Sequence, residues 1–385
     1  MADRDYVTEP TTAASINHYI CYCCKRCARK GRRRCIPQEV MVEILLLLPA
    51  RVVHDVMKHV CREWNLMIST KDFIQLHLRN STPGFLIQEE FPDLNGYKEM
   101  RQHRNVIYLE MRRGCLEICK SDTGFEYLLF TSCNGLVVAP GFRDSDVYYV
   151  TNPLTKQRAI IPPNSSEIEC YSNFALAFAE PSMDYKVVCA CGKDSKRRPT
   201  QIAVLTIGVD SVWRHIDIRH SSFGIFRHFT FVTGGYVHWI GRTAVLTLNV
   251  ENETISWFPM PRVPRIRGKF LPMGCNLSFL YQINEFTWDV WEMNSNSGEW
   301  SMIFSLDLEP FRCHFKDYGL KHSLLAVPYG WLAIREVLIF SSGGIQTHCL
   351  VYYVKTKEIQ LFTLDTNTRS HRFQAHVNSL VWLEQ

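Results

Sequence analysis

The sequence predicts a mainly β protein, a β-propeller of about six blades preceded by a small all-helical module. Three observations predict this fold. Beyond residue 80 the chain consists of short runs rich in Val, Ile, Phe, Tyr and Trp, separated by Asn, Gly, Asp and Pro. The turns return at intervals of roughly 40–60 residues, as they do in four-stranded propeller blades. Residues 36–78 instead carry the periodicity of helices.

The chain begins with a basic, cysteine-rich leader, residues 1–34, that we expect to be disordered. Its residues 25–34 carry seven positive side chains with no acid between them, so the formal net charge of +5 is a local feature. Three other interpretations stay open: a zinc site on Cys21, Cys24, Cys27 and Cys35, palmitoylation of the thiols, or a nuclear address. The seven residues of this basic run are Lys25, Arg26, Arg29, Lys30, Arg32, Arg33 and Arg34.

Residues 36–78 are predicted to form three short helical segments. Pro37 stands where a helix can begin without losing a hydrogen bond, and Pro49 ends the run Val40–Leu48, because proline lacks the N–H that a helix interior needs. Apolar residues then recur at intervals of three and four, and one face is expected to continue to the last segment. These residues are Val52, Val53, Val56, His59, Val60, Trp64, Met67 and Ile68.

Four consecutive leucines, Leu45 to Leu48, make the first helix apolar on more than one side. A bundle of about forty residues cannot bury so much apolar surface alone. The sequence therefore predicts an external partner for this segment.

The order of these residues resembles the F-box, the module that docks a Skp-type adaptor in Skp–cullin–F-box ubiquitin ligases. We place this domain at residues 35–79. The chain departs from the family where Leu46 and Leu47 replace polar or basic residues, and the stretch from Pro49 to Trp64 is longer than the commonest form. The resemblance implies that a Skp-type adaptor, and through it a cullin, binds here. The contact residues that it implies are Ile36, Pro37, Ile44, Leu45, Leu48, Pro49, Val60, Cys61 and Trp64.

A crude unit recurs in the β region: an apolar strand, a polar turn, then a strand with an aromatic residue or proline. Copies begin at Val147, Ile202, Val245, Trp288 and Leu350. Asn134-Gly135 is expected to form a hairpin turn, because Asn and Gly tolerate positive φ. A pair of large β-sandwiches, or an irregular barrel, is the alternative to the propeller.

Six tryptophans punctuate this region, and we expect most of them in the core between blades, because aromatic side chains bury the most apolar area. A platform for carbohydrate or peptide is the alternative. The residues are Trp213, Trp239, Trp257, Trp288, Trp291 and Trp300.

Several short motifs, taken in order, resemble the F-box-associated domain, the kelch-like β module that follows the F-box in many plant proteins. We place this kelch-like β-propeller at residues 80–385. The resemblance implies a substrate adaptor in a plant cell. The motifs are SCNGLV from Ser132, NPLTKQ from Asn152, AFAEPSMDYKVV from Ala177, VHWI from Val237 and DVWEM from Asp289.

The sequence offers little support for an enzyme. It has no G-x-G-x-x-G, no G-x-x-x-x-G-K-[ST], no H-E-x-x-H and no G-x-S-x-G. Cysteines in the β region are expected to be buried thiols rather than nucleophiles, with no metal and no cofactor. They are Cys133, Cys189, Cys191, Cys275 and Cys313.

Two basic loops interrupt the β pattern and have a turn-like composition, so we expect them to be exposed. If both lie on one rim, they could grip an acidic or phosphorylated segment; otherwise they are solvated connections. The candidate substrate-binding residues are Arg197, Arg198, Arg262, Arg265, Arg267 and Lys269.

These observations together predict a non-catalytic substrate adaptor of a ubiquitin ligase, with an unidentified protein as its target. A propeller scaffold that uses its helices for another partner, or a propeller enzyme, is the alternative. Neither a signal peptide nor a run of about eighteen apolar residues is visible. We therefore expect no stable membrane association and a location in the nucleus, the cytoplasm or both. We also expect no nucleic-acid binding, because the excess of basic residues is confined to the leader.

Overall fold

The computed structural model divides the chain into two compact units, Met1–Asn80 and Ser81–Gln385. Each unit is considered by itself below. The structure describes residues 37–90, 106–112, 115–120, 129, 131–140, 147–164, 169–170, 174–192, 200–218, 230–263, 268–313, 327–332, 335–342, 347–364 and 370–383.

The first unit is helical. Pro37 and Pro49 stand at the N-cap positions of its first two helices, as the sequence predicts. The expectation of one continuous apolar face after Pro49 is wrong. The chain breaks there into two α-helices and a 3-10 turn, and Val56 and Val60 are exposed. The elements are α2 (Gln38–Leu46), α3 (Ala50–Asp55), η1 (Met57–His59), α4 (Arg62–Ile68) and α5 (Lys71–Asn80).

The core of the helical unit is small and includes one polar link. Leu45, Val53, Ile68 and Phe73 are almost fully buried. The buried His77 in α5 donates a hydrogen bond from Nε2 to the carbonyl oxygen of residue 48, at 2.9 Å. That carbonyl lies between the C-cap of α2 and the N-cap of α3, so the bond fixes α5 against the junction of these two helices.

The second unit contains six antiparallel sheets, which we number as blades 1 to 6. From the inside outward, blade 1 consists of β25 (Ser370–Val377), β1 (Pro83–Glu90), β2 (Val106–Arg112) and β3 (Cys115–Lys120), and blade 2 of β4 (Thr131–Cys133), β5 (Leu136–Pro140), β6 (Tyr148–Thr151) and β7 (Arg158–Ile161). Blade 3 consists of β9 (Ala175–Ala179), β10 (Asp184–Gly192), β11 (Gln201–Thr206) and β12 (Arg214–Asp217), with β8 (Glu169–Cys170) also paired to β10.

Blades 4 to 6 follow the same up-and-down order. Blade 4 consists of β13 (Thr230–Thr233), β14 (Tyr236–Ile240), β15 (Ala244–Asn249) and β16 (Thr254–Pro259), and blade 5 of β17 (Gly268–Met273), β18 (Asn276–Gln282), β19 (Thr287–Met293) and β20 (Trp300–Asp307). Blade 6 consists of β21 (Val327–Leu332), β22 (Val337–Ser342), β23 (Thr347–Tyr353) and β24 (Glu358–Leu364), and the short turn η2 (Glu309–Phe311) precedes it.

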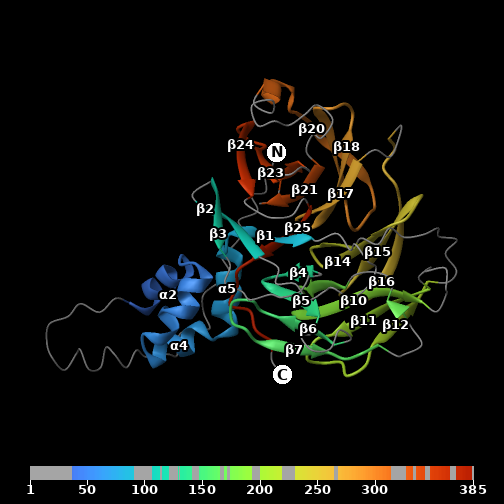
Figure 1. The fold of residues 1–385 in the computed structure, drawn as a ribbon. Helices are drawn as coiled ribbons and strands as arrows, with labels where there is room; N and C mark the ends of the chain where they lie inside the picture. Colours follow the sequence, from blue (N-terminus) through green and yellow to red (C-terminus); the bar gives the residue numbers. More distant parts are fainter. Residues whose placement is uncertain are drawn as a thin grey trace, which may run out of the picture. The chain divides into compact units, whose positions relative to one another are not determined.

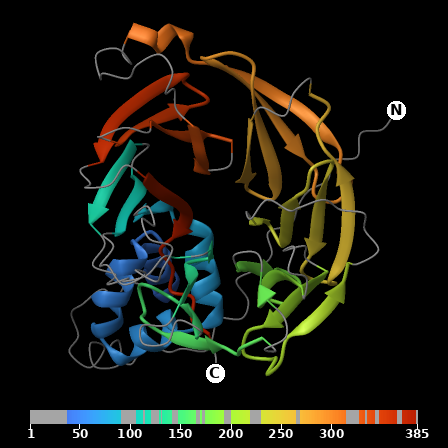
Figure 2. The same cartoon turned by 45° about the vertical axis from the view of Figure 1, so that its right-hand side comes forward.

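The blades form a closed ring, as Figure 2 shows. The innermost strands contact one another in the order β25, β4, β9, β13, β17, β21 and back to β25. Each blade has four strands of alternating direction, so its outermost strand ends at the side of the ring where its innermost strand begins. The chain then enters the next innermost strand, and the six innermost strands run in the same direction. The prediction of a propeller of about six blades is confirmed, and the sandwich and barrel alternatives are wrong.

The ring closes through the carboxy-terminal strand. β25 pairs along its length with β1, so the last strand completes the blade that the first strand begins. Beyond β25, Ser379 Oγ donates to the carbonyl oxygen of Asn134 at 2.6 Å, and Asn152 Nδ2 donates to the carbonyl oxygen of Ser379 at 3.0 Å. Asn134 and Gly135 have φ of 51° and 86°, which confirms the predicted turn.

The recurring sequence unit corresponds to one part of each blade. Its copies are the hairpins between the third and fourth strands of blades 2 to 6. In four of these hairpins, a residue just before the outer strand has positive φ: Lys156, Glu253, Gly298 and Lys357. The sequence periodicity therefore corresponds to the turn between the third and fourth strands, which involves only neighbouring residues and recurs in each of these blades.

Tryptophans fill part of the space between blades. Trp213, Trp239 and Trp288 are buried, as expected, and Trp291 and Trp300 are partly buried. Trp257 is the exception among the six, since its side chain on the outer strand of blade 4 is 37% exposed. The platform interpretation therefore has no cluster of exposed tryptophans to support it among the described residues.

Candidate interaction surfaces

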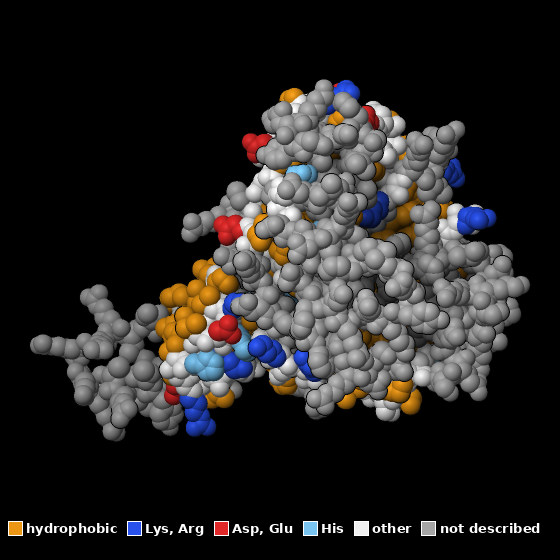
Figure 3. Space-filling view, viewed as in Figure 1, with side chains coloured by type: hydrophobic (Ala, Val, Ile, Leu, Met, Phe, Trp, Pro, Cys, Tyr) orange, Lys and Arg blue, Asp and Glu red, His pale blue; other side chains and the backbone are white. Residues whose placement is uncertain are grey.

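The helical unit exposes a set of aliphatic side chains. Figure 3 shows hydrophobic side chains gathered around α2. Leu47, at the end of this helix, is 81% exposed, and Ile44, one turn earlier, is 44% exposed. The other exposed aliphatic residues of this unit are Val40, Val56, Val60, Leu66 and Leu76. This set is the apolar surface of the helical unit.

The predicted adaptor-binding residues fall into three groups. Pro37, Ile44, Pro49 and Val60 are exposed, Leu48, Cys61 and Trp64 are partly buried, and Leu45 is buried in the core. Ile36 lies outside the described residues. The structure thus separates side chains that a partner could touch from one that supports them.

Leu47, the most exposed aliphatic residue, was not among the predicted contacts. The signal was present in the run of four leucines. Leu45 and Leu46 face the core and Leu47 faces solvent, because a helix turns each successive residue by about 100°. A run of four therefore must place at least one side chain outside.

Cys61 has a structural role at the start of α4. Its Sγ accepts a hydrogen bond from the backbone N–H of Trp64 at 3.5 Å, which satisfies one unpaired donor of the helix end. Burial raises the pKa of the Cys61 thiol, although the Trp64 N–H acts in the opposite sense. The thiol is therefore neutral near pH 7 and suits a cap better than a nucleophile.

The predicted basic loops are only partly described. Arg197, Arg198, Arg265 and Arg267 lie outside the described residues, and Arg262 is exposed. The expectation that the last candidate lies in an exposed loop is wrong, because Lys269 is the second residue of β17.

Lys269 lies in an unusual setting. Its Nζ is 4.1 Å from the centroid of the Tyr329 ring on β21, the innermost strand of blade 6. Burial lowers the pKa of its ammonium group to about 8. Tyr329 is in turn 4.6 Å from the ring of Phe373 on β25. Three neighbouring innermost strands thus contribute one cation and two aromatic rings.

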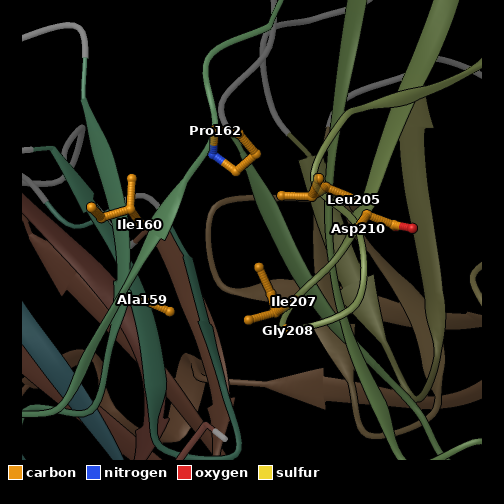
Figure 4. Close-up of a pocket in the computed structure, with 7 residues that line it drawn as sticks. All are labelled: Ala159, Ile160, Pro162, Leu205, Ile207, Gly208 and Asp210. Atoms are coloured by element: carbon orange, nitrogen blue, oxygen red, sulfur yellow. The ribbon is translucent and has the colours of Figure 1, made fainter. Parts of the chain in front are cut away.

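A small pocket of about 300 Å³ lies between the outer parts of blades 2 and 3 (Figure 4). Its walls are apolar except for Asp210, whose carboxylate points away from Ile160 and bonds Arg214. The pocket therefore offers no free polar group for chemistry. Its lining residues are Ala159, Ile160, Pro162, Leu205, Ile207, Gly208 and Asp210.

Cysteines and histidines of the propeller have structural settings. Cys189 and Cys191 are buried, as expected, and burial raises the pKa of the Cys133 thiol to about 12. The expectation is wrong for Cys275 and Cys313, which are exposed. The raised pKa keeps the Cys133 thiol neutral near pH 7, which does not suit a nucleophile.

Ser132 and His376 form a pair that resembles a nucleophile and its base, at 2.8 Å between Oγ and Nδ1. His376 is buried, and burial lowers its pKa to about 4. The pair joins β4 to β25 at the ring closure, and none of the described carboxylates bonds the imidazole. It therefore serves as a link between the first and last parts of the ring.

Within the described ranges, no group of three or more His, Cys, Asp or Glu side chains could hold a metal ion. No helix in this part of the chain is long and apolar enough to cross a membrane.

Comparison with known proteins gives three findings. Residues 115–382 match the F-box associated beta propeller domain. Two proteins of Arabidopsis thaliana are similar: F-box protein At5g07610, 24% identical with 72% of each chain covered, and F-box protein At5g49610, 23% identical with 71% of this chain and 79% of the other covered. The crystal structure of TolB from Acinetobacter baumannii matches with a TM-score of 0.45 and 9% identity, over 81% of this chain and 72% of TolB.

Proposed function

This chain belongs to the family of F-box-associated β-propeller proteins, and on that premise we propose that it is a substrate-recognition adaptor of a Skp–cullin–F-box ubiquitin ligase. The helical unit binds a Skp-type adaptor and through it a cullin. The propeller holds a target protein. The place of action is the nucleus, the cytoplasm or both.

The apolar surface of the helical unit is the observation that carries this proposal. Residues 37–80 form too small a unit to cover these aliphatic side chains by themselves. Burying one such side chain fully in an interface contributes about 1.5–3 kcal/mol. A partner that covers several of them therefore gains enough free energy to offset the cost of association.

The residues of this surface have different roles in the proposal. Ile44, Leu47 and Val60 contact the adaptor directly. Leu45 is buried and holds α2 in place, and Cys61 fixes the start of α4. The contact residues and the supporting residues should therefore respond differently to substitution.

The propeller contributes position rather than chemistry. An enzyme recruited by the cullin transfers ubiquitin, and this chain brings the target close to it. Tethering raises the effective concentration of the target at the enzyme, which accelerates transfer without any catalytic side chain here. The family, whose members are typically non-catalytic, supports this division of labour.

Co-purification of the full chain with a plant Skp-type adaptor tests the proposal. Replacing Ile44 and Val60 by Ser should weaken binding at least tenfold, because two exposed anchors lose their contact. A matched control replaces Ile160 and Val209, which are 66% and 73% exposed on the propeller. The control should bind like the wild type.

Two outcomes contradict the proposal. If the folded wild-type chain does not bind the adaptor, the helical unit serves another partner. If the wild-type chain is instead a dimer in size-exclusion chromatography and Ile44→Ser with Val60→Ser makes it a monomer, a second copy covers the apolar surface, and the scaffold alternative is correct.

A further inference from the structure

The innermost strands of the propeller share a charge pattern. Strands β4, β9, β13, β17, β21 and β25 contain no Asp or Glu. Their charged residues are Lys269 on β17 and Arg372 on β25, with two histidines on the latter strand. The short strand β8 contains Glu169, but it belongs to blade 3. Strand β17 packs instead against β13 of blade 4 and β21 of blade 6. The six innermost strands therefore carry basic residues and no acidic ones.

Lys269 has no carboxylate among its described neighbours. The strands packed against β17 are β13, β18 and β21, and their ionisable side chains are Tyr281 and Tyr329. No described residue forms a salt bridge with Lys269. The interaction that the structure records for its Nζ is with the Tyr329 ring, 4.1 Å from the ring centroid.

An ammonium group in this setting is incompletely satisfied. The face of an aromatic ring attracts a cation, but it cannot accept the three directed hydrogen bonds that an ammonium offers. Burial already disfavours the charge and lowers the pKa to about 8, yet the group is still mostly protonated at pH 7. A positive charge with open donors therefore stands at the inner ring.

The side chain is within reach of a ligand. Lys269, Tyr329 and Phe373 are each partly exposed rather than sealed in the core. They come from β17, β21 and β25, three innermost strands that follow one another around the ring (Figure 1). Lys269 is the second residue of β17 and so lies toward the end of the ring at which this strand begins.

We propose that Lys269 is an anion-binding residue at this end of the ring, and that its ligand is an acidic segment of a bound protein that places a carboxylate or phosphate oxygen on Nζ. The anion site itself does not depend on the proposed function. The assignment of its ligand to a target protein does.

The aromatic neighbours fit this role. The Tyr329 ring holds the ammonium in place from one side and leaves its other donors free. Phe373 supports Tyr329 at 4.6 Å between ring centroids. The ligand oxygen therefore meets an ammonium group that is already positioned, so that less conformational entropy is lost on binding.

Proton linkage gives the site a characteristic pH dependence. The anion binds the ammonium form, so binding raises the pKa of Lys269 above its free value of about 8. Affinity is full below pH 8 and falls as the pH rises beyond it. The strands β13, β18 and β21, which pack against β17, contain no Asp, Glu, His or Cys.

The test measures binding of a fluorescent hexaglutamate peptide to the full chain, with hexaglutamine as the neutral peptide and inorganic phosphate as a competitor. Lys269→Met should weaken hexaglutamate binding at least tenfold, and Lys269→Arg should keep it within about threefold because it preserves the charge. Lys355→Met, at a 79% exposed lysine of blade 6 that pairs with Glu336, is the matched control and should bind like the wild type.

Protection of Lys269 from acetylation, followed by mass spectrometry, tests the site without a variant that could fail to fold. The peptide should slow acetylation of Lys269 more than tenfold and leave Lys355 unaffected. Equal binding by the wild type and a folded Lys269→Met, or equal acetylation with and without peptide, would overturn the proposal.

The remaining outcomes are also decisive. If inorganic phosphate protects Lys269 from acetylation and hexaglutamate neither binds nor protects it, the site binds free anions and the proposal that its ligand is an acidic protein segment is overturned. Binding of hexaglutamine as tight as that of hexaglutamate would overturn the anion site. Lys269→Met should still co-purify with the Skp-type adaptor, so failure of this site and failure of the proposed function give different results.

Discussion

The helical unit and the propeller treat their hydrophobic residues in opposite ways. Of the sixteen exposed large hydrophobic side chains among the described residues, seven lie between residues 37 and 80. The propeller, several times longer, buries most of its aliphatic and aromatic side chains between blades, as in the cluster around Trp239 and Leu246.

This difference follows from how each unit is built. The propeller is a closed ring in which each blade covers the face of the next, so nearly every apolar face has an internal partner. The helical unit consists of short helices, each of which can present only one side to a small core. Stability should therefore depend most on buried residues of the propeller, and binding on exposed residues of the helical unit.

The largest effect is expected inside the propeller core. Trp239→Ala should lower the free energy of unfolding by about 3–5 kcal/mol, because a fully buried indole between blades 3 and 4 leaves a cavity. Trp257→Ala, at a 37% exposed position of blade 4, should cost less than about 1.5 kcal/mol. Urea unfolding followed by fluorescence measures both. Similar losses at the two positions would contradict the comparison.

The ring closure should be the next most sensitive place. Gly135 and Gly235 have nearly equal φ, 86° and 87°, but an added Cβ at Gly135 would collide with Ser379 Oγ, whereas at Gly235 the nearest atom is 3.3 Å away. Gly135→Ala should therefore cost about 3 kcal/mol, the sum of backbone strain and a displaced carboxy-terminal segment. Gly235→Ala should cost about 1 kcal/mol from strain alone.

Thermal unfolding of the two glycine variants measures this difference. Equal melting temperatures would mean that the segment around Ser379 does not hold the ring closed.

An ion-pair network links blades 3 and 4 and should have an intermediate effect. Lys186 Nζ lies 2.9 Å from Glu253 Oε1 and donates to the carbonyl oxygen of Val250 at 2.6 Å, and Arg214 bonds both Glu253 and Asp210. Glu253→Gln should cost about 2 kcal/mol, because the ammonium of Lys186 stays buried without its carboxylate.

The same network predicts a pH dependence. Burial acts to raise the pKa of both Glu253 and Asp210, but hydrogen bonds outweigh it and both pKa values are lowered. Glu253 accepts hydrogen bonds from Arg214 and Lys186. Asp210 accepts them from the Thr206 N–H and from Arg214. Lowered carboxyl pKa values stabilise the fold above the unfolded pKa of about 4, and this stability is lost as pH falls through the folded values.

Wild-type stability should therefore decrease in acid, and Glu253→Gln should show a shallower decrease. Chemical unfolding between pH 6 and pH 3 measures both slopes. Parallel slopes would show that the carboxylate of Glu253 contributes no pH-dependent stability.

The smallest effects separate core from surface within the helical unit itself. Val53 is fully buried and Val56, three residues later, is 52% exposed. Val53→Ala should cost about 1–2.5 kcal/mol and Val56→Ala less than about 0.5 kcal/mol. Thermal loss of the helical circular dichroism signal ranks the two. Greater destabilisation by Val56→Ala would mean that the apolar surface stabilises the unit without a partner.

The sequence alone was sufficient to predict those structural features that depend on residues close together in the chain. Pro37 and Pro49 set helix starts because a proline ring has no N–H, and Asn134-Gly135 made a turn because these residues accept positive φ. The spacing of the outer hairpins gave the approximate number of blades. These features involve residues close together in the chain.

The candidate site was less predictable. The basic composition drew attention to Lys269, but the expected setting was a solvated loop. Its position in β17 against Tyr329 depends on how two blades pack, and the two residues are far apart in the sequence. Leu47 was overlooked for a related reason, since the run of leucines alone does not say which of them faces the core.

The sequence by itself therefore determined the two-part organisation, the β-propeller class and the turns, because side-chain periodicity and backbone preferences act within a few residues. Only the tertiary structure decided how β25 completes the first blade, where the run after Pro49 breaks, and which cation packs on an aromatic ring without a carboxylate among its described neighbours. These depend on contacts between distant residues, whose free energies outweigh local preferences and leave no pattern in a single sequence.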